Sequence, residues 1–141
     1  DITKGLTTAQ AFLDQGADVI LPVAGQVGEG AARAALDSGT ASIIWVDSDG
    51  YDTLSPDFRP VLLTSVLKNT GSAVVEIVKT SIDDTFDNAP FIGTLENGGV
   101  GIAPFHDLAP RVSAELSAEI DQLRSDIVAG TIVVTSPSTP R

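Results

Sequence analysis

The feature that most constrains the fold is a strand, a glycine-rich turn and a helix in direct succession between residues 19 and 38. Residues 19–23 form a continuous apolar run, the pattern of a strand buried on both faces of a sheet. Glycines at 25, 28 and 30 follow it, and the alanine-rich residues 28–38 predict a helix whose small side chains allow close packing on a sheet. This succession is typical of α/β domains with a parallel sheet.

Two further apolar runs predict strands that end in polar residues. Residues 42–47 predict a strand ending in Asp47, and residues 61–67 predict a strand followed by Lys68. Because the carboxyl ends of parallel strands meet at one edge of a sheet, we expect any ligand to bind at this edge.

The rest of the chain completes an alternating pattern. Helices are predicted over 2–15, 72–86 and 112–129, the first with a capping box at Thr7 to Gln10. Residues 48–60 predict a loop, and Asn97-Gly98 predicts a hairpin with arms 91–95 and 99–103. Residues 131–134 resemble a short edge strand. We therefore expect an α/β fold with a doubly wound, mostly parallel sheet.

Composition excludes several classes of partner. The chain has 141 residues, a net charge of −11 and only eight basic residues, so nucleic acid and anionic membrane surfaces are not expected partners. It has no Cys and one His, so we expect no metal centre and no cofactor. No apolar run approaches the roughly 18 residues that a membrane span requires.

The glycine turn differs from a dinucleotide fingerprint. Its pattern is G-x-x-G-x-G instead of G-x-G-x-x-G, and Glu29 places a carboxylate where a pyrophosphate would meet the helix N-terminus. Tight turning and close helix–sheet packing explain the glycines without a ligand. A nucleotide-dependent enzyme is therefore the weakest of the functional hypotheses.

The residues alone leave the roles of the two strand-end residues open. Asp47 could accept hydrogen bonds from a sugar diol, or it could be a solvated or capping acid. Lys68 could donate to a ligand hydroxyl or pair with Asp47, or it could be an ordinary exposed lysine.

Other polar groups indicate no chemistry. The acids that follow Asp47 lack the glycine and glutamate of an EF-hand loop. Adjacent His106 and Asp107 are interpreted as incidental, and Trp45 and Tyr51 as packing or rim residues. We expect a binding protein without enzymatic activity.

Six motifs occur in a fixed order along the chain. They are Asp1-x-x-Lys4-Gly5, Gly16-Ala17-Asp18-Val19-Ile20, Val23-Ala24-Gly25-x-x-Gly28-x-Gly30, Val46-Asp47-Ser48-Asp49, Leu63-Thr64-Ser65-Val66-x-Lys68 and Gly98-Gly99-Val100-Gly101-Ile102-Ala103-Pro104-Phe105-His106-Asp107. Together they resemble the basic membrane protein family, the nucleoside-binding lipoproteins (purine nucleoside receptor A type) of bacterial ABC importers, and the last motif is the most specific.

The resemblance implies the C-terminal part of a type I periplasmic binding protein fold, which closes two lobes over a ligand. Residues 1–134 would form the C-terminal lobe region and 135–141 a flexible tail. The implied partners are a nucleoside-like molecule, an ABC transporter permease and an N-terminal lobe outside this chain. The implied location is extracytoplasmic, anchored through an N-terminal lipid. A sheet edge left exposed without that lobe predicts pairing with a second copy, which light scattering on the isolated chain would detect as a mass above the monomer's.

The resemblance also implies a short list of ligand-binding residues. Asp47 matches the family's ribose-binding acid, Lys68 a lysine near the same sugar, and Ala24 and Gly25 a loop lining the cleft. Two departures affect base preference: Leu21-Pro22 stands where an aromatic residue is frequent, and Gly50 where glutamine is common. The resemblance thus favours capture of a nucleoside, most simply a purine nucleoside, for import. A cytoplasmic ligand-sensing transcriptional regulator of the same family is the alternative.

Overall fold

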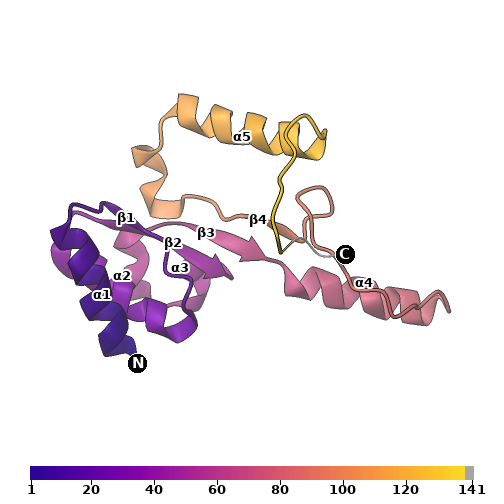
Figure 1. Ribbon diagram of the computed structural model, residues 1–141, viewed down its shortest axis with the longest axis horizontal. Coiled ribbons are helices and arrows are strands. Elements are labelled where there is room, and N and C mark those ends of the chain that lie inside the picture. The colour runs from indigo at the N-terminus through magenta and orange to yellow at the C-terminus, as the bar shows by residue number, and fades with distance from the viewer. Residues whose placement is uncertain (139–141) are drawn as a thin grey trace. The chain divides into compact units, whose positions relative to one another are not determined.

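The computed structural model describes residues 1–138, which form two compact units (Figure 1). The first unit comprises Asp1–Leu67 and Ile102–Val112, and the second comprises residues 68–101 and the chain from Ser113 onward. The chain therefore leaves the first unit and returns to it, so residues distant in sequence complete the first unit.

One sheet with the strand order β1-β2-β3-β4 confirms the α/β class. The strands are β1 (Val19–Ile20), β2 (Ser42–Asp47), β3 (Leu62–Lys68) and β4 (Val100–Ile102). β1, β2 and β3 are mutually parallel, with a register shift between Ile43 and Ile44. Two backbone hydrogen bonds, from Ala103 N to Ser65 O and from Asn69 N to Gly99 O, both 2.9 Å, show that β4 runs antiparallel to β3.

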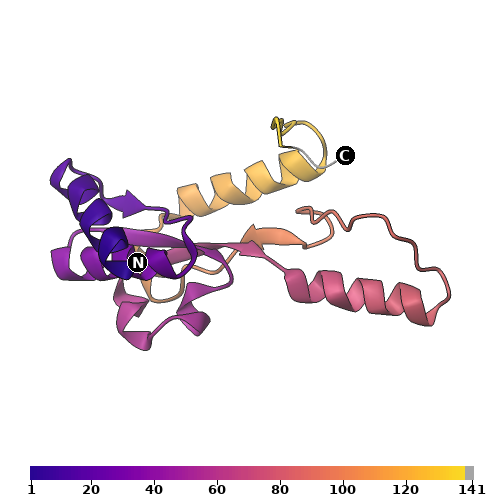
Figure 2. The same ribbon diagram turned by 60° about the horizontal axis from the view of Figure 1, so that its bottom comes forward.

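Helices α1 (Ile2–Asp14) and α2 (Gly28–Ser38) lie side by side in the first unit (Figures 1 and 2). α2 has the predicted bounds, and its buried positions are all small: Gly28, Gly30, Ala31, Ala32, Ala34 and Ala35. A Cβ on Gly30 would lie 2.5 Å from the Leu6 nitrogen and closer still to the Ile2 carbonyl oxygen. The absence of a side chain at Gly30 therefore sets the approach of the two helices.

The core of the first unit lies between α2 and β2. Ile43 is fully buried, and Trp45 is 7% exposed, which confirms its packing role. The indole of Trp45 lies between two glycines, because a Cβ on Gly28 or on Gly50 would stand 2.9 Å from Trp45 atoms. Gly50 thus occupies a position that glutamine could not enter without moving the tryptophan.

The predicted capping box at the first helix is wrong. α1 begins at Ile2, and the Asp1 side chain accepts a hydrogen bond from Thr3 N (3.0 Å) as its N-cap. The Thr7 hydroxyl lies in the helix interior and donates to the carbonyls of Thr3 and Lys4. An acid at the first position offered a better cap than the threonine pair inside the apolar periodicity.

The strand predicted over 19–23 is much shorter than expected. β1 covers only Val19–Ile20, and Val19 is 43% exposed, so this strand is not buried on both faces. Pro22 cannot donate to a ladder, and Ala24 N instead donates to Pro22 O (3.0 Å) in a turn. The apolar run was long enough for a five-residue strand, but the proline ended it.

The loop predicted over 48–60 contains two helical segments. The four-residue α3 (Gly50–Thr53) begins where Asp49 Oδ1 accepts from Tyr51 N (3.1 Å), and the 3₁₀ helix η2 spans Pro56–Val61. Local side-chain caps, at Asp49 and Ser55, produce both. A second 3₁₀ helix, η1 (Gly25–Val27), precedes α2, and a third, η3 (His106–Arg111), follows β4.

The described part of the second unit contains α4 (Thr70–Ile82) and α5 (Ala114–Val128). α4 begins before the predicted residue 72 and ends before residue 86, whereas α5 lies within the predicted range 112–129. Neither has a buried residue, and the apolar stripe of α4 is exposed, with Ile82 at 75%. The predicted pairing of this chain with a second copy remains a prediction.

The predicted hairpin is only partly formed. Asn97 organises its turn, accepting from Thr94 N (2.8 Å) and Gly99 N (2.9 Å), but residues 91–95 form no strand. Residues 131–134 form no strand either. Residues 135–138 of the predicted tail belong to the described part of the chain, and residues 139–141 lie outside it. Among the described helices, none is long and apolar enough to cross a membrane.

Candidate functional site

The four residues predicted to bind ligand follow the carboxyl ends of parallel strands. Asp47 is the last residue of β2 and Lys68 the last residue of β3, while Ala24 and Gly25 come after β1. Asp47 is in register with Leu67, so the ends of β2 and β3 coincide to within one residue. This arrangement is the strand-end edge at which open α/β sheets bind ligands.

Asp47 has an unusual backbone. Its φ is 69°, in the left-handed region, and Ser48 N donates to Val46 O across it at 2.9 Å. A positive φ beneath a hydrogen bond between residues two apart describes a classic γ-turn, which is rare and strained. The turn places an exposed carboxylate at the point where the strand stops.

The other three predicted residues are also exposed. Gly25 has a φ of 54°, which glycine adopts without cost, and it opens η1 beside Ala24. Lys68 is the first residue of the second unit. Within the first unit, the strand ends thus present one acid and an exposed backbone segment, groups suited to hydrogen bonding of hydroxyl groups.

A cluster centred on Asp49 was missed by the sequence reasoning. Asp49 Oδ2 accepts a 2.7 Å hydrogen bond from His106 Nε2, and Asp49 Oδ1 accepts from Ser65 Oγ at 3.3 Å. Ser65, which is 1% exposed, in turn accepts from Gly50 N at 3.0 Å. The cluster therefore joins the turn after β2 to the middle of β3 and to η3.

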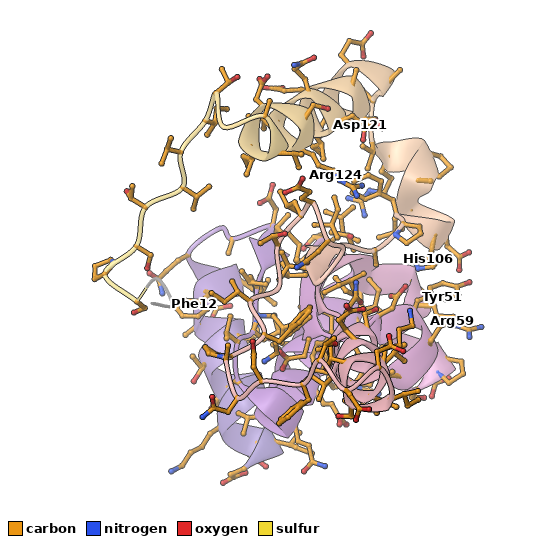
Figure 3. The ribbon with its side chains drawn as sticks, turned by 90° about the vertical axis from the view of Figure 1, so that its right-hand side faces the viewer. Phe12, Tyr51, Arg59, His106, Asp121 and Arg124 are labelled. Carbon is orange, nitrogen blue, oxygen red and sulfur yellow. The ribbon has the colours of Figure 1, made fainter. Side chains whose placement is uncertain are left out.

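Three side chains stack beside this cluster, as the labelled residues in Figure 3 show. The Tyr51 and His106 rings have centroids 4.1 Å apart at 14°, and the Arg59 guanidinium carbon lies 4.3 Å from the Tyr51 ring centroid. The Tyr51 hydroxyl donates to Asp107 at 3.1 Å. Tyr51 is a half-buried residue at the rim, as the sequence suggested.

The interpretation of His106 and Asp107 as incidental is corrected by these contacts. Each binds a different partner, His106 to Asp49 and Asp107 to Tyr51. The carboxylate of Asp49 lies between Ser65 and His106, whereas in a catalytic triad the histidine lies between serine and acid. Fifty-seven positions separate Asp49 from His106, so no local periodicity could have paired them. The only signal was the place of His106 in the last motif of the resemblance.

The hydroxyl of Tyr51 is expected to titrate above its ordinary pKa of 10.0. Partial burial raises this pKa most, and the hydrogen bond and negative charge of Asp107 raise it further against the opposing charge of Arg59. The stability that the contact contributes is present below pH 10 and is lost as pH rises through the raised pKa. Tyr51 is the sole tyrosine, so phenolate absorbance at 295 nm reports it directly.

Asp107→Asn should lower that midpoint, because it removes the nearby negative charge. A midpoint at or below 10.0 in the unmodified chain would show that the Tyr51–Asp107 contact does not form.

The motifs of the glycine turn, of the Asp47 turn and of the segment entering η3 therefore converge on one unit. A family model described as "Bmp: ABC transporter substrate-binding protein PnrA-like" matches residues 1–138. The chain belongs to this family. The resemblance inferred from the motifs is thereby confirmed.

Solved structures share the fold of this PnrA-like chain. A solute-binding protein of an ABC transporter system from Conexibacter woesei DSM 14684 superposes with a TM-score of 0.74 at 20% identity, covering 96% of this chain and 43% of that one. A solute-binding protein from Aeropyrum pernix K1 gives 0.79 at 22% identity, with 99% and 46% covered. A transcriptional activator of the comK gene from Bacillus halodurans gives 0.77 at 18% identity, with 96% and 45% covered. The PnrA-like chain thus spans less than half of each of these proteins.

Proposed function

We propose that this PnrA-like chain is part of the solute-binding component of a bacterial ABC importer and that it binds a nucleoside, most simply a purine nucleoside. The observation that carries the proposal is the exposed Asp47 carboxylate at the end of β2, within a chain of a substrate-binding family. An acid at this position can accept hydrogen bonds from two adjacent ribose hydroxyls.

The proposed mechanism is binding without chemistry. Lys68 donates to the same sugar, and the backbone of Ala24 and Gly25 lines the cleft. A second lobe outside this chain supplies most contacts to the base and closes over the ligand. The complex then delivers the nucleoside to the permease from an extracytoplasmic, lipid-anchored position.

Two departures in sequence bear on the base. Gly50 stands where glutamine is common in the family that the sequence resembles, and Trp45 fills the space that a side chain at 50 would need. Leu21, which is 48% exposed, offers an aliphatic instead of an aromatic surface after β1. Both changes act on base preference and leave the sugar contact in place.

Asp47→Ala should weaken nucleoside binding by about 1.5–3 kcal/mol in the full-length protein, because charge-assisted hydrogen bonds to the diol are lost. Calorimetric titration with adenosine, guanosine, inosine, cytidine and ribose measures the effect. Asp57→Ala, which removes another exposed acid of the first unit, is the matched control and should leave affinity unchanged. Unchanged affinity in Asp47→Ala would refute the site.

The N-terminal sequence of the full-length protein distinguishes the importer component from the alternative, a cytoplasmic regulator. The fold does not choose between the two, because the Bacillus halodurans activator shares it at 18% identity. A signal peptide with a lipid-attachment cysteine in the full-length sequence, together with nucleoside binding, would support the importer component. A leaderless full-length sequence would favour the regulator.

A further inference from the structure

We infer that His106 is a positioning residue for Asp47: through Asp49 it holds the turn at residues 46–50 in the strained form that presents the Asp47 carboxylate. The inference rests on the proposed function for the role of Asp47 in binding. It concerns a residue outside the predicted ligand-binding set.

The turn needs an external restraint. Asp47 has a left-handed backbone, with φ of 69°, beneath the 2.9 Å hydrogen bond from Ser48 N to Val46 O. Backbone in this region persists only where the surrounding structure over-determines it. The strand before Asp47 is restrained by pairing with β3, so the second restraint must act after Asp47.

Asp49 supplies that second restraint. Its Oδ1 accepts from Tyr51 N (3.1 Å) and Ser65 Oγ (3.3 Å), and its Oδ2 accepts from His106 Nε2 (2.7 Å). The Tyr51 contact is local, whereas Ser65 and His106 tie Asp49 to β3 and η3. The carboxylate is thus held at both oxygens by elements distant in sequence.

His106 is the stronger of these two distant ties. Its hydrogen bond is the shortest of the three to Asp49. It holds Oδ2, whereas Tyr51 N and Ser65 Oγ both donate to Oδ1. The ring cannot turn away freely, because it is stacked on Tyr51 at 4.1 Å, and Tyr51 is covered by Arg59 (Figure 3). His106 itself has a φ of 43°, so two of the three non-glycine residues with positive φ in the described chain lie at the two ends of this linkage.

The first test measures the backbone conformation of Asp47 in the absence of a ligand. The first observable is the NMR three-bond coupling between the amide and α protons of Asp47 in isotope-labelled full-length protein. The second is the set of Asp47 carbon chemical shifts. Both report the left-handed φ of this residue. His106→Asn keeps a residue that tolerates positive φ but is too short to reach Asp49, so these signals should move toward extended values. His106→Gln retains an N–H of similar reach and should restore them. Asp52→Asn, a neighbouring exposed acid, is the control and should leave them unchanged.

The second test reads binding. His106→Asn should weaken nucleoside affinity about tenfold, because binding must then restore a strained backbone, and His106→Gln should recover most of it. In an Asp47→Ala background, His106→Asn should change affinity less than twofold, since it acts through Asp47.

The outcomes separate the two hypotheses. Unmoved Asp47 signals in His106→Asn overturn the positioning role, as does an equal loss of affinity with and without Asp47. If Asp47→Ala leaves nucleoside affinity intact while His106→Asn still moves the Asp47 signals, the proposed function fails and the positioning of this turn by His106 stands.

Discussion

Gly30→Ala is expected to lower the free energy of unfolding by about 3 kcal/mol, the upper part of the range for overpacking in a core. A Cβ at this position would meet backbone atoms of α1, which cannot rotate aside as a side chain end can. It would stand 2.5 Å from Leu6 N and 2.9 Å from Gly5 C. The two helices would have to separate, which loosens the small-residue face of α2 along its length.

Urea denaturation followed by the fluorescence of Trp45, the sole tryptophan, measures this effect inside the same unit. Gly71→Ala is the matched control, because a Cβ there meets nothing within 4 Å and the position lies in helix α4. Because Gly71 lies in the second unit, that change should leave the unfolding transition reported by Trp45 unchanged. Equal effects of the two substitutions would contradict the close approach of α1 and α2.

Asp49→Ala is expected to cost about 2–4 kcal/mol of stability. It removes the N-cap of α3, worth about 1 kcal/mol, and the charge-assisted hydrogen bond from His106, worth about 1.5–3 kcal/mol. It also takes one partner from the buried Ser65 hydroxyl, which keeps its bond from Gly50 N.

Asp49→Asn separates these contributions in the same denaturation experiment. The amide oxygen can still cap α3, so this variant should lose roughly half as much as alanine. Asp52→Ala is the control. Because Asp52 is exposed, this change should alter the free energy of unfolding by less than about 0.5 kcal/mol. A loss in Asp49→Ala no larger than in Asp52→Ala would contradict the cluster.

The parts of the fold that sequence predicts well are those that local pattern determines. α2 has its predicted bounds because its alanines and its terminal Gly39, with φ of 66°, act within one segment. β2 also has its predicted bounds, since a compact apolar run ends at Asp47. The family was predictable because several short motifs occur in a fixed order.

The predictions that were wrong concern segments in which two neighbouring residues favour different local structures. Asp1, and not the predicted capping box at Thr7, caps the first helix. The strand that begins at Val19 ends before Pro22, although the apolar run continues. The positions of Asp47 and Lys68 at strand ends followed from the parallel pattern, whereas the Asp49 cluster did not. A contact between residues 49 and 106 depends on how β3 and β4 bring two segments together, which no short window contains.

The discontinuity of the first unit has a consequence for how the protein emerges from the ribosome. Asp49 is synthesised 57 positions before His106, and at 5–20 residues per second that interval lasts roughly 3–11 s. During this time the nascent chain carries β2, β3 and the Asp47 turn without η3. The turn therefore acquires its contact with His106 only after the whole of residues 68–101 has been made, so the order of synthesis makes the strand-end edge at Asp47 one of the last parts of the first unit to mature.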